Sequence, residues 1–198
     1  MKIGLYFGSF NPIHNGHLII ANYVLNYAKI DQVWFVVSPQ NPLKRSNSLL
    51  NEHHRKNLID LCIEGESSLR SSNVEFKLPK PSYTIDTLTY LEELYPKYEF
   101  AIIMGSDSFS NIRKWKNHEL LVQNYEIYIY KRIGYEIESN LPKIHVMDAP
   151  LLEISSTYIR DLIKQSKSIR FLLPDIAKEE IQRQNYYRTL KKNSKEQA

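Results

Sequence analysis

The sequence predicts an α/β protein, in which a doubly wound parallel sheet carries helices on both faces. Short apolar runs of the length of a buried strand recur along the chain, and residues 100–104 (FAIIM) form the most apolar of them. Segments with apolar residues three and four positions apart separate these runs, which is the spacing of helices that face a core. Such alternation of strands and helices is typical of a parallel sheet covered on both sides.

Length and composition indicate a single globular domain. The chain has 198 residues, of which 42% are hydrophobic and 24% charged, and this balance is that of a folded protein. It contains no internal repeat, low-complexity segment or interdomain linker. We therefore predict one domain over residues 1–182 and a basic tail, open to fraying, over residues 183–198.

The first half of the chain is expected to hold three strands and two helices. The strands are predicted at residues 3–7, 32–38 and 73–78. One helix follows His17 and directs Leu18, Ala21, Leu25 and Ala28 toward the core. The other covers residues 51–62, with Leu58, Leu61 and Cys62 on its apolar face.

The second half repeats this alternation. A helix capped by Ser82 or Thr84 is expected to run to Pro96, and the central strand 100–104 follows it. Further strands are predicted at residues 125–130 and 143–147, with a surface excursion between them. Ser155 or Ser156 caps a helix, and residues 175–184 form the last one.

The composition also bears on where the chain works. No apolar run approaches the roughly 18 residues that cross a bilayer, and no signal-peptide pattern opens the sequence. The single cysteine, Cys62, excludes an internal disulfide and is expected to be a buried, inert thiol. These features favour a cytoplasmic protein.

The net charge of +4 raises the question of nucleic-acid binding. Residues from Arg183 onward carry the whole of this excess, so the preceding domain is close to neutral. A basic tail is therefore favoured over a nucleic-acid surface. Removing the residues after Gln182 would separate the two, because an enzyme is expected to keep its turnover without them.

The stretch Gly8–His17 (GSFNPIHNGH) joins the first strand to the first helix. A helix start offers free backbone N–H groups and partial positive charge, and Gly8 and Ser9 allow close approach of a ligand. His14 and His17 lie three residues apart at this point, where two imidazoles can donate hydrogen bonds to a phosphate. Taken singly, either histidine is equally explained as a cap or a surface residue.

A second anion site is predicted at residues 154–160 (ISSTYIR). Ser156, Thr157 and Arg160 share the polar face of a helix start, because they are three and four residues apart. Hydroxyls, backbone N–H groups and a planar guanidinium together make a phosphate cradle. An ordinary capped helix with a surface arginine is the alternative.

Other loops offer further candidates. Lys44 leaves the second strand in a Pro-rich loop, where it meets a triphosphate or is merely solvated. Trp115 is either structural or a ring that stacks on a planar ligand. His53 and His54 have no cysteine or well-spaced third ligand with them, so zinc is disfavoured.

Four stretches together resemble bacterial nicotinate-nucleotide adenylyltransferases of the nucleotidylyltransferase superfamily: GSFNPIHNGH, PSYTIDT, GSDS followed by a tryptophan, and ISSTYIR. The first and last are superfamily motifs, whereas PSYTIDT and Trp115 point to the pyridine-nucleotide branch. The likeness extends from Lys2 to about Arg170. Asn11 departs from the family's usual Asp, and Gly8-Ser9 from its usual Gly-Thr.

The resemblance implies a Rossmann-like fold and a reaction of NAD biosynthesis. Nicotinic acid mononucleotide would attack the α-phosphorus of ATP, giving nicotinic acid adenine dinucleotide and pyrophosphate. Mg²⁺ would be held by phosphates and water, with no protein side chain as ligand. ATP and the mononucleotide are the expected partners, without nucleic acid or membrane.

The resemblance also assigns residues to roles. His14 and His17 would bind the α- and β-phosphates, and Ser156, Thr157 and Arg160 the β- and γ-phosphates. Further contacts to ATP are expected from Gly8, Ser9, Phe10, Lys44, Gly105 and Asp107, the last two near the ribose. Tyr83 and Thr84 would approach the nicotinate carboxylate, and Trp115 would stack on the pyridine ring.

Several alternatives stay open at this point. The acceptor could be nicotinamide mononucleotide or phosphopantetheine, and the histidine motif does not separate adenylyl from cytidylyl transfer. A non-catalytic nucleotide- or RNA-binding module is disfavoured by the paired motifs. The sequence is compatible with a homo-oligomer as well as a monomer.

Overall fold

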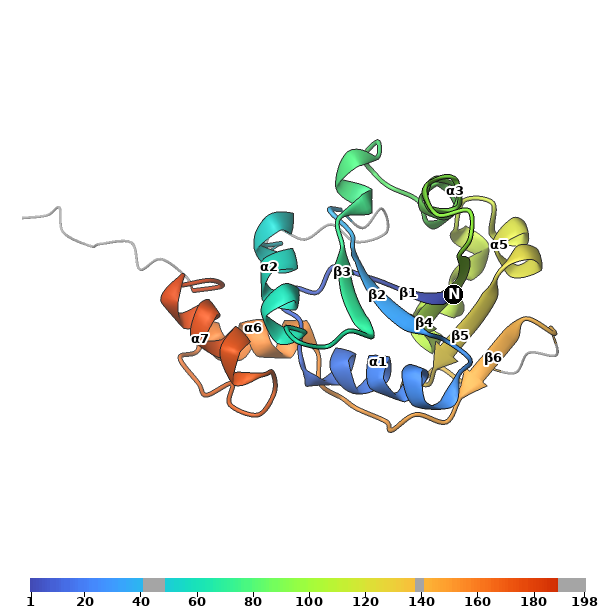
Figure 1. The fold of residues 1–198 in the computed structure, drawn as a ribbon. Coiled ribbons are helices and arrows are strands. Elements are labelled where there is room, and N and C mark those ends of the chain that lie inside the picture. Colours follow the sequence, from blue (N-terminus) through green and yellow to red (C-terminus); the bar gives the residue numbers. More distant parts are fainter. Residues whose placement is uncertain (41–48, 138–140, 189–198) are drawn as a thin grey trace, which may run out of the picture.

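The computed structural model describes residues 1–40, 49–137 and 141–188. Its centre is a six-stranded sheet in the order β3-β2-β1-β4-β5-β6, with every neighbouring pair parallel (Figure 1). The strands are β1 (Lys2–Gly8), β2 (Gln32–Val37), β3 (Leu69–Ser72), β4 (Glu99–Gly105), β5 (Glu126–Tyr130) and β6 (Ile144–Met147). The predicted α/β class with a doubly wound parallel sheet is confirmed.

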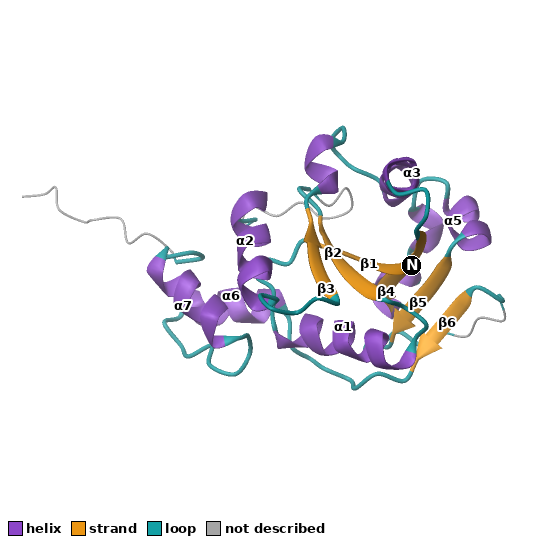
Figure 2. Ribbon diagram, in the orientation of Figure 1, coloured by secondary structure: helices purple, strands orange, loops and turns teal. Residues whose placement is uncertain are grey.

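Helices cover both faces of this sheet (Figure 2). The α-helices are α1 (Asn15–Tyr27), α2 (Glu52–Cys62), α3 (Thr84–Leu94), α4 (Ser106–Phe109), α5 (His118–Asn124), α6 (Ser156–Lys164) and α7 (Asp175–Arg183). Two 3-10 helices, η1 (Val74–Lys77) and η2 (Ile112–Lys114), complete the described elements. Helices α1, α2, α6 and α7 pack on one face, and α3 and α5 pack on the other.

The two central strands show why the sheet is buried on both sides. In β1, Ile3 and Leu5 face the α3 side, while Tyr6 faces the α1 side. In β4, Ile102 faces the α3 side and Ile103 the α1 side. Successive side chains of a strand alternate between faces, so a strand covered twice must be apolar throughout. The prediction that 100–104 is central is therefore correct.

One predicted strand is wrong. Residues 73–78 do not form a strand, because β3 ends at Ser72 and the chain turns into η1. The turn is fixed by the Ser72 hydroxyl, which accepts from the Val74 N–H, and by the Asn73 carbonyl, which accepts from the Phe76 N–H. The segment NVEFKL alternates in sequence like a strand, but these hydrogen bonds close a 3-10 turn at Val74–Lys77 instead.

Helix faces and caps also differ in detail from the prediction. In α1, Ile20 and Val24 join Ala21 as the buried residues, while Leu18, Leu25 and Ala28 are only partly buried. Neither Ser82 nor Thr84 caps α3, because Tyr83 occupies the cap position without a side-chain hydrogen bond. At α6, Ser155 is the cap and its hydroxyl accepts from the Tyr158 N–H.

The structure describes the first six residues of the predicted tail, 183–188. Within them Tyr186 and Tyr187 pack against the core of the α1 side, while residues 189–198 lie outside the described part of the chain. The division between domain and tail at residues 182 and 183 stays a prediction. Among the described residues no helix combines the length and apolar character needed to span a bilayer.

Candidate functional site

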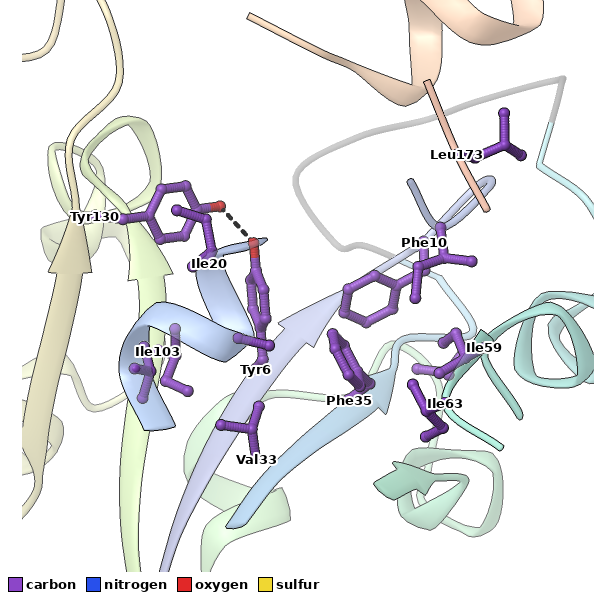
Figure 3. Close-up of a cluster of buried hydrophobic side chains, with 14 of the residues drawn as sticks. Tyr6, Phe10, Ile20, Val33, Phe35, Ile59, Ile63, Ile103, Tyr130 and Leu173 are labelled. Carbon is purple, nitrogen blue, oxygen red and sulfur yellow. Dashed lines mark hydrogen bonds between the residues drawn. The ribbon is translucent and has the colours of Figure 1, made fainter. Parts of the chain in front are cut away.

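The loop between β1 and α1 is held by the packing of Phe10. The Phe10 ring is buried and lies edge-on to Tyr6 and Phe35 (Figure 3). It is also edge-on to the His17 ring, with 5.0 Å between the two ring centroids. A Cβ on Gly8 would come within 2.9 Å of the Phe10 ring, so the position requires glycine. Phe10 itself adopts a φ of 43°, a left-handed conformation that costs a bulky residue energy. Burial of the ring offsets that strain.

Arg55 clamps the same loop from α2. Its side chain is fully buried, and its guanidinium donates to backbone carbonyls of Ser9, Ser38 (2.9 Å) and Leu50 (2.7 Å). No role was predicted for Arg55 from the sequence. Its spacing from Leu58 signals its burial, because a residue three positions before a core leucine lies on the same helix face.

His14 and His17 meet at the amino end of α1. Their rings stack at 3.7 Å between centroids, and Nδ1 of His17 accepts from the His14 backbone N–H at 3.3 Å. This bond leaves Nε2 of a neutral His17 as the nitrogen that carries the proton. Burial and the charge of Arg132 lower the pKa of His14 to about 3, and burial, His14 and Arg132 lower that of His17. Both rings are therefore neutral hydrogen-bond donors at neutral pH.

Arg132 is a cation of this site that sequence analysis missed. It lies two residues after the end of β5, stacks over the Tyr130 ring at 5.3 Å and lies 4.0 Å from Asp107. Burial opposes its charge, but Tyr130, Tyr6 and Asp107 outweigh that effect and raise the pKa of Arg132. Its Nε is buried without a hydrogen-bond partner among the described residues. Its position after a parallel strand was the available signal.

The start of α6 docks on the loop that precedes α1. Ser156 donates its hydroxyl to the Pro12 carbonyl at 2.8 Å, and Arg160 donates to the Asn11 carbonyl at 2.7 Å and to the Thr157 hydroxyl at 3.2 Å. The two helix beginnings, about 140 residues apart in sequence, thus lie against one loop. The Asn11 side chain, at the family's usual Asp position, accepts from the Leu50 N–H.

A cavity of about 400 Å³ opens on the α3 side of the same loop. Gly8, Tyr83, Thr84, Asp107 and Trp115 line it, and all five are predicted site residues. Its other lining residues are Phe7, Ser38, Glu75, Ser82, Ser108, Asn111, Lys114 and Lys116. The cavity thus combines aromatic rings with hydroxyls, an amide and two cationic side chains.

Glu75 is a buried carboxylate in that cavity wall. It accepts from the Ser82 hydroxyl at 2.7 Å and from the Thr87 hydroxyl at 3.0 Å, which ties η1 to the start of α3. Burial raises the pKa of Glu75, against the lowering effect of these hydrogen bonds. The sequence pattern predicted a strand here, so Glu75 was not recognised as a residue of the candidate site.

The predicted site residues fall into three adjoining groups around the loop from Gly8 to His14. The histidines line a shallow hollow with Arg132 and Tyr130, the α6 residues hold Asn11 and Pro12, and the third group lines the cavity. Gly105 supports the third group, because a Cβ there would collide with the Asp107 carboxylate. Ser9 and Phe10 serve the loop itself. Lys44 lies outside the described residues.

Protein ligands for a metal are not assembled in this region. The described residues contain no group of three or more His, Cys, Asp or Glu side chains that could hold a metal ion. Cys62 is partly buried, and burial raises the pKa of its thiol to about 12, which makes it unreactive.

Known proteins are similar to this chain in sequence. Residues 5–162 match the family model described as cytidylyltransferase-like. A protein of Flavobacterium johnsoniae named probable nicotinate-nucleotide adenylyltransferase is 50% identical to this chain, over 95% of this chain and 100% of that protein. A protein of the same name in Cytophaga hutchinsonii is 48% identical, over 94% of this chain and 98% of that protein.

Solved structures agree with these matches. Plasmodium falciparum nicotinic acid mononucleotide adenylyltransferase complexed with NaAD gives a TM-score of 0.79 at 25% identity, over 94% of this chain and 97% of that chain. The same enzyme complexed with APC gives 0.77 at 25% identity, over 94% and 96%. The chain belongs to the cytidylyltransferase-like family and, within it, to the nicotinate-nucleotide adenylyltransferases.

Proposed function

We propose that this protein transfers the adenylyl group of ATP to nicotinic acid mononucleotide, a step of NAD biosynthesis. The observation that carries the proposal is the convergence of two helix beginnings on one loop, beside a cavity with aromatic walls. The names of the relatives and the NaAD complex of the Plasmodium enzyme agree with it. ATP and the mononucleotide are therefore the proposed substrates.

The reaction requires that the two substrates are positioned and that the developing charge is stabilised. A 5′-phosphate oxygen of the mononucleotide attacks the α-phosphorus of ATP, the bond from that phosphorus to the bridging oxygen breaks, and pyrophosphate leaves. No protein nucleophile is needed, because the substrate phosphate supplies one. The protein must hold two anions together and absorb the charge that develops during transfer.

The phosphates of ATP are assigned to the histidine and α6 groups. The neutral rings of His14 and His17 would donate hydrogen bonds to the α- and β-phosphates, and an arriving anion would favour their protonated forms as well. Ser156, Thr157 and Arg160 would take the β- and γ-phosphates. Arg132, half-buried beside the histidines, adds a positive charge to the same region.

The cavity is assigned to the mononucleotide. Trp115 offers a flat ring for the pyridine, and backbone groups of Tyr83 and Thr84, at the start of α3, would meet the nicotinate carboxylate. Asp107 and the nearby Gly105 would lie by the ribose of ATP. Gly8, which ends β1 and lines this cavity, would supply a backbone contact to ATP.

Mg²⁺ is proposed to arrive with the triphosphate. The described side chains include no carboxylate cluster that would hold it, so phosphate oxygens and water are its ligands in this proposal. The ion would neutralise phosphate charge. Cytoplasmic location and the oligomeric state stay predictions from the sequence.

A product assay tests the proposal. The protein is incubated with Mg²⁺, either ATP or CTP, and one acceptor from nicotinic acid mononucleotide, nicotinamide mononucleotide and phosphopantetheine, and the products are identified by mass. We expect nicotinic acid adenine dinucleotide and pyrophosphate to form fastest. Faster transfer to another acceptor, or from CTP, would reassign the substrate.

A further inference from the structure

The residues that follow α7 pack back onto α2 and the core of the α1 side. The chain bends sharply at Asn185 (φ 55°) and Tyr187 (φ 63°), and the Tyr186 N–H donates to the Ile181 carbonyl at 3.0 Å. The Tyr186 hydroxyl meets Nδ1 of His54 on α2 at 2.8 Å. Helices α2 and α7 lie side by side (Figure 1). This turn is therefore anchored to α2, the helix that carries Arg55.

Tyr187 places a polar group in an apolar setting. Its ring packs against the core of the α1 side, and its hydroxyl is buried without a hydrogen-bond partner among the described residues. Burial raises the pKa of this hydroxyl, and the positive charges of Arg55 and Arg160 partly offset the effect. The hydroxyl is therefore neutral and within the electrostatic reach of both arginines.

These two arginines donate to backbone carbonyls on either side of Phe10, in the loop from Gly8 to His14. Arg55 donates to the Ser9 carbonyl and Arg160 to the Asn11 carbonyl. Arg160 also donates to Thr157, and its Nε is buried without a partner in the described part of the chain. The Arg160 Nε and the Tyr187 hydroxyl thus both lack partners in the described part of the chain, and Tyr187 and α6 pack into the same core on the α1 side. Leaving both groups unpaired is costly unless the working enzyme uses them.

We propose that Tyr187 is a positioning residue for Arg160, whose guanidinium donates to the Tyr187 hydroxyl oxygen when it engages the triphosphate of ATP. The inference rests on the proposed function and extends it to residues that the sequence assigned to a tail. A guanidinium has five N–H donors in a rigid plane, so one fixed edge orients the other toward phosphate. Tyr187 would fix that edge.

The test is Tyr187→Phe, which removes the hydroxyl and keeps the packed ring. We expect the dissociation constant for ATP, measured by calorimetry without acceptor, and the KM for ATP to rise about fivefold or more, as for loss of a hydrogen bond to a charged group. The KM for the mononucleotide and the melting temperature should change little. Tyr27→Phe, which removes an exposed hydroxyl at the end of α1, is the matched control and should leave ATP affinity unchanged.

A double-mutant cycle with Arg160→Ala identifies the partner. In that background Tyr187→Phe should have no further effect on ATP affinity, because the group that it orients is gone. Unchanged ATP affinity in Tyr187→Phe alone, or the same loss in both backgrounds, would overturn the inference. A wild-type protein that transfers adenylyl to no mononucleotide would instead refute the proposed function.

Discussion

Two stacked histidines at one helix start are the residues on which catalysis is expected to depend. His17 has its Nδ1 engaged by the backbone, so its proton lies on Nε2 and its role as a donor is set before substrate arrives. We expect His17→Ala to reduce kcat about hundredfold or more, the usual cost of removing a donor that stabilises the transition state. His118→Ala, at the first position of α5, is the control and should retain activity. Near-normal turnover of His17→Ala would contradict the assigned role.

The neighbouring His14 makes stability depend on pH. Its pKa is about 3 in the folded protein, because of burial and the charge of Arg132, and about 6.5 in an unfolded chain. Between these values only the unfolded state binds the proton, so the free energy of unfolding falls as the pH drops below 6.5. We expect a loss of about 2 kcal/mol between pH 6.5 and pH 5.

Chemical denaturation of the wild type and of His14→Gln at pH 7.5 and pH 5 measures this dependence. The variant should lose less stability on acidification, although His17, whose pKa is also lowered, keeps part of the effect. Equal losses in both proteins would show that His14 titrates normally in the folded state.

At the scale of elements, the junction of η1 and α3 shapes the cavity. Glu75 accepts from Ser82 and Thr87, on either side of the Tyr83–Thr84 backbone assigned to the nicotinate carboxylate. We expect Ser82→Ala to raise the KM for the mononucleotide severalfold, because the start of α3 loses an anchor and a buried Glu75 oxygen loses its donor. Steady-state kinetics with each substrate varied in turn measures this. Thr89→Ala, which removes a hydroxyl that donates to the Ile85 carbonyl within α3, is the control.

The same junction shows where prediction from sequence stopped. Strands 3–7, 32–38, 100–104, 125–130 and 143–147 were predictable, because short runs dominated by apolar residues, alternating with polar ones at 125–130, have few alternatives in a sheet buried on both faces. The segment at 73–78 was not, since its alternating pattern hid a 3-10 turn fixed by side-chain hydrogen bonds. Glu75 was therefore missed along with the element that carries it. Arg55 and Arg132 were missed because their roles depend on contacts between distant segments.

At the scale of the molecule, the loop after β1 lies between two substrate regions, one toward each face of the sheet. The α6 group lies on the α1 side, and Trp115 packs on the α3 side. This arrangement predicts that damage to one region spares binding in the other. The sequence predicts that these motifs meet at one edge of the sheet, because parallel strands place all their carboxyl ends there. It does not predict the distances between the motifs.

Paired substitutions test that separation. Arg160→Ala should raise the KM for ATP about tenfold while changing the KM for the mononucleotide little, because a guanidinium assigned to the β- and γ-phosphates does not touch the acceptor. Trp115→Ala should do the reverse, since it removes only the ring offered to the pyridine. Both constants are measured for both variants, with Arg170→Ala, an exposed arginine stacked on Phe171, as the control for loss of charge. If either variant weakened both substrates equally, the two regions would form one coupled site, because each assigned contact reaches only its own substrate.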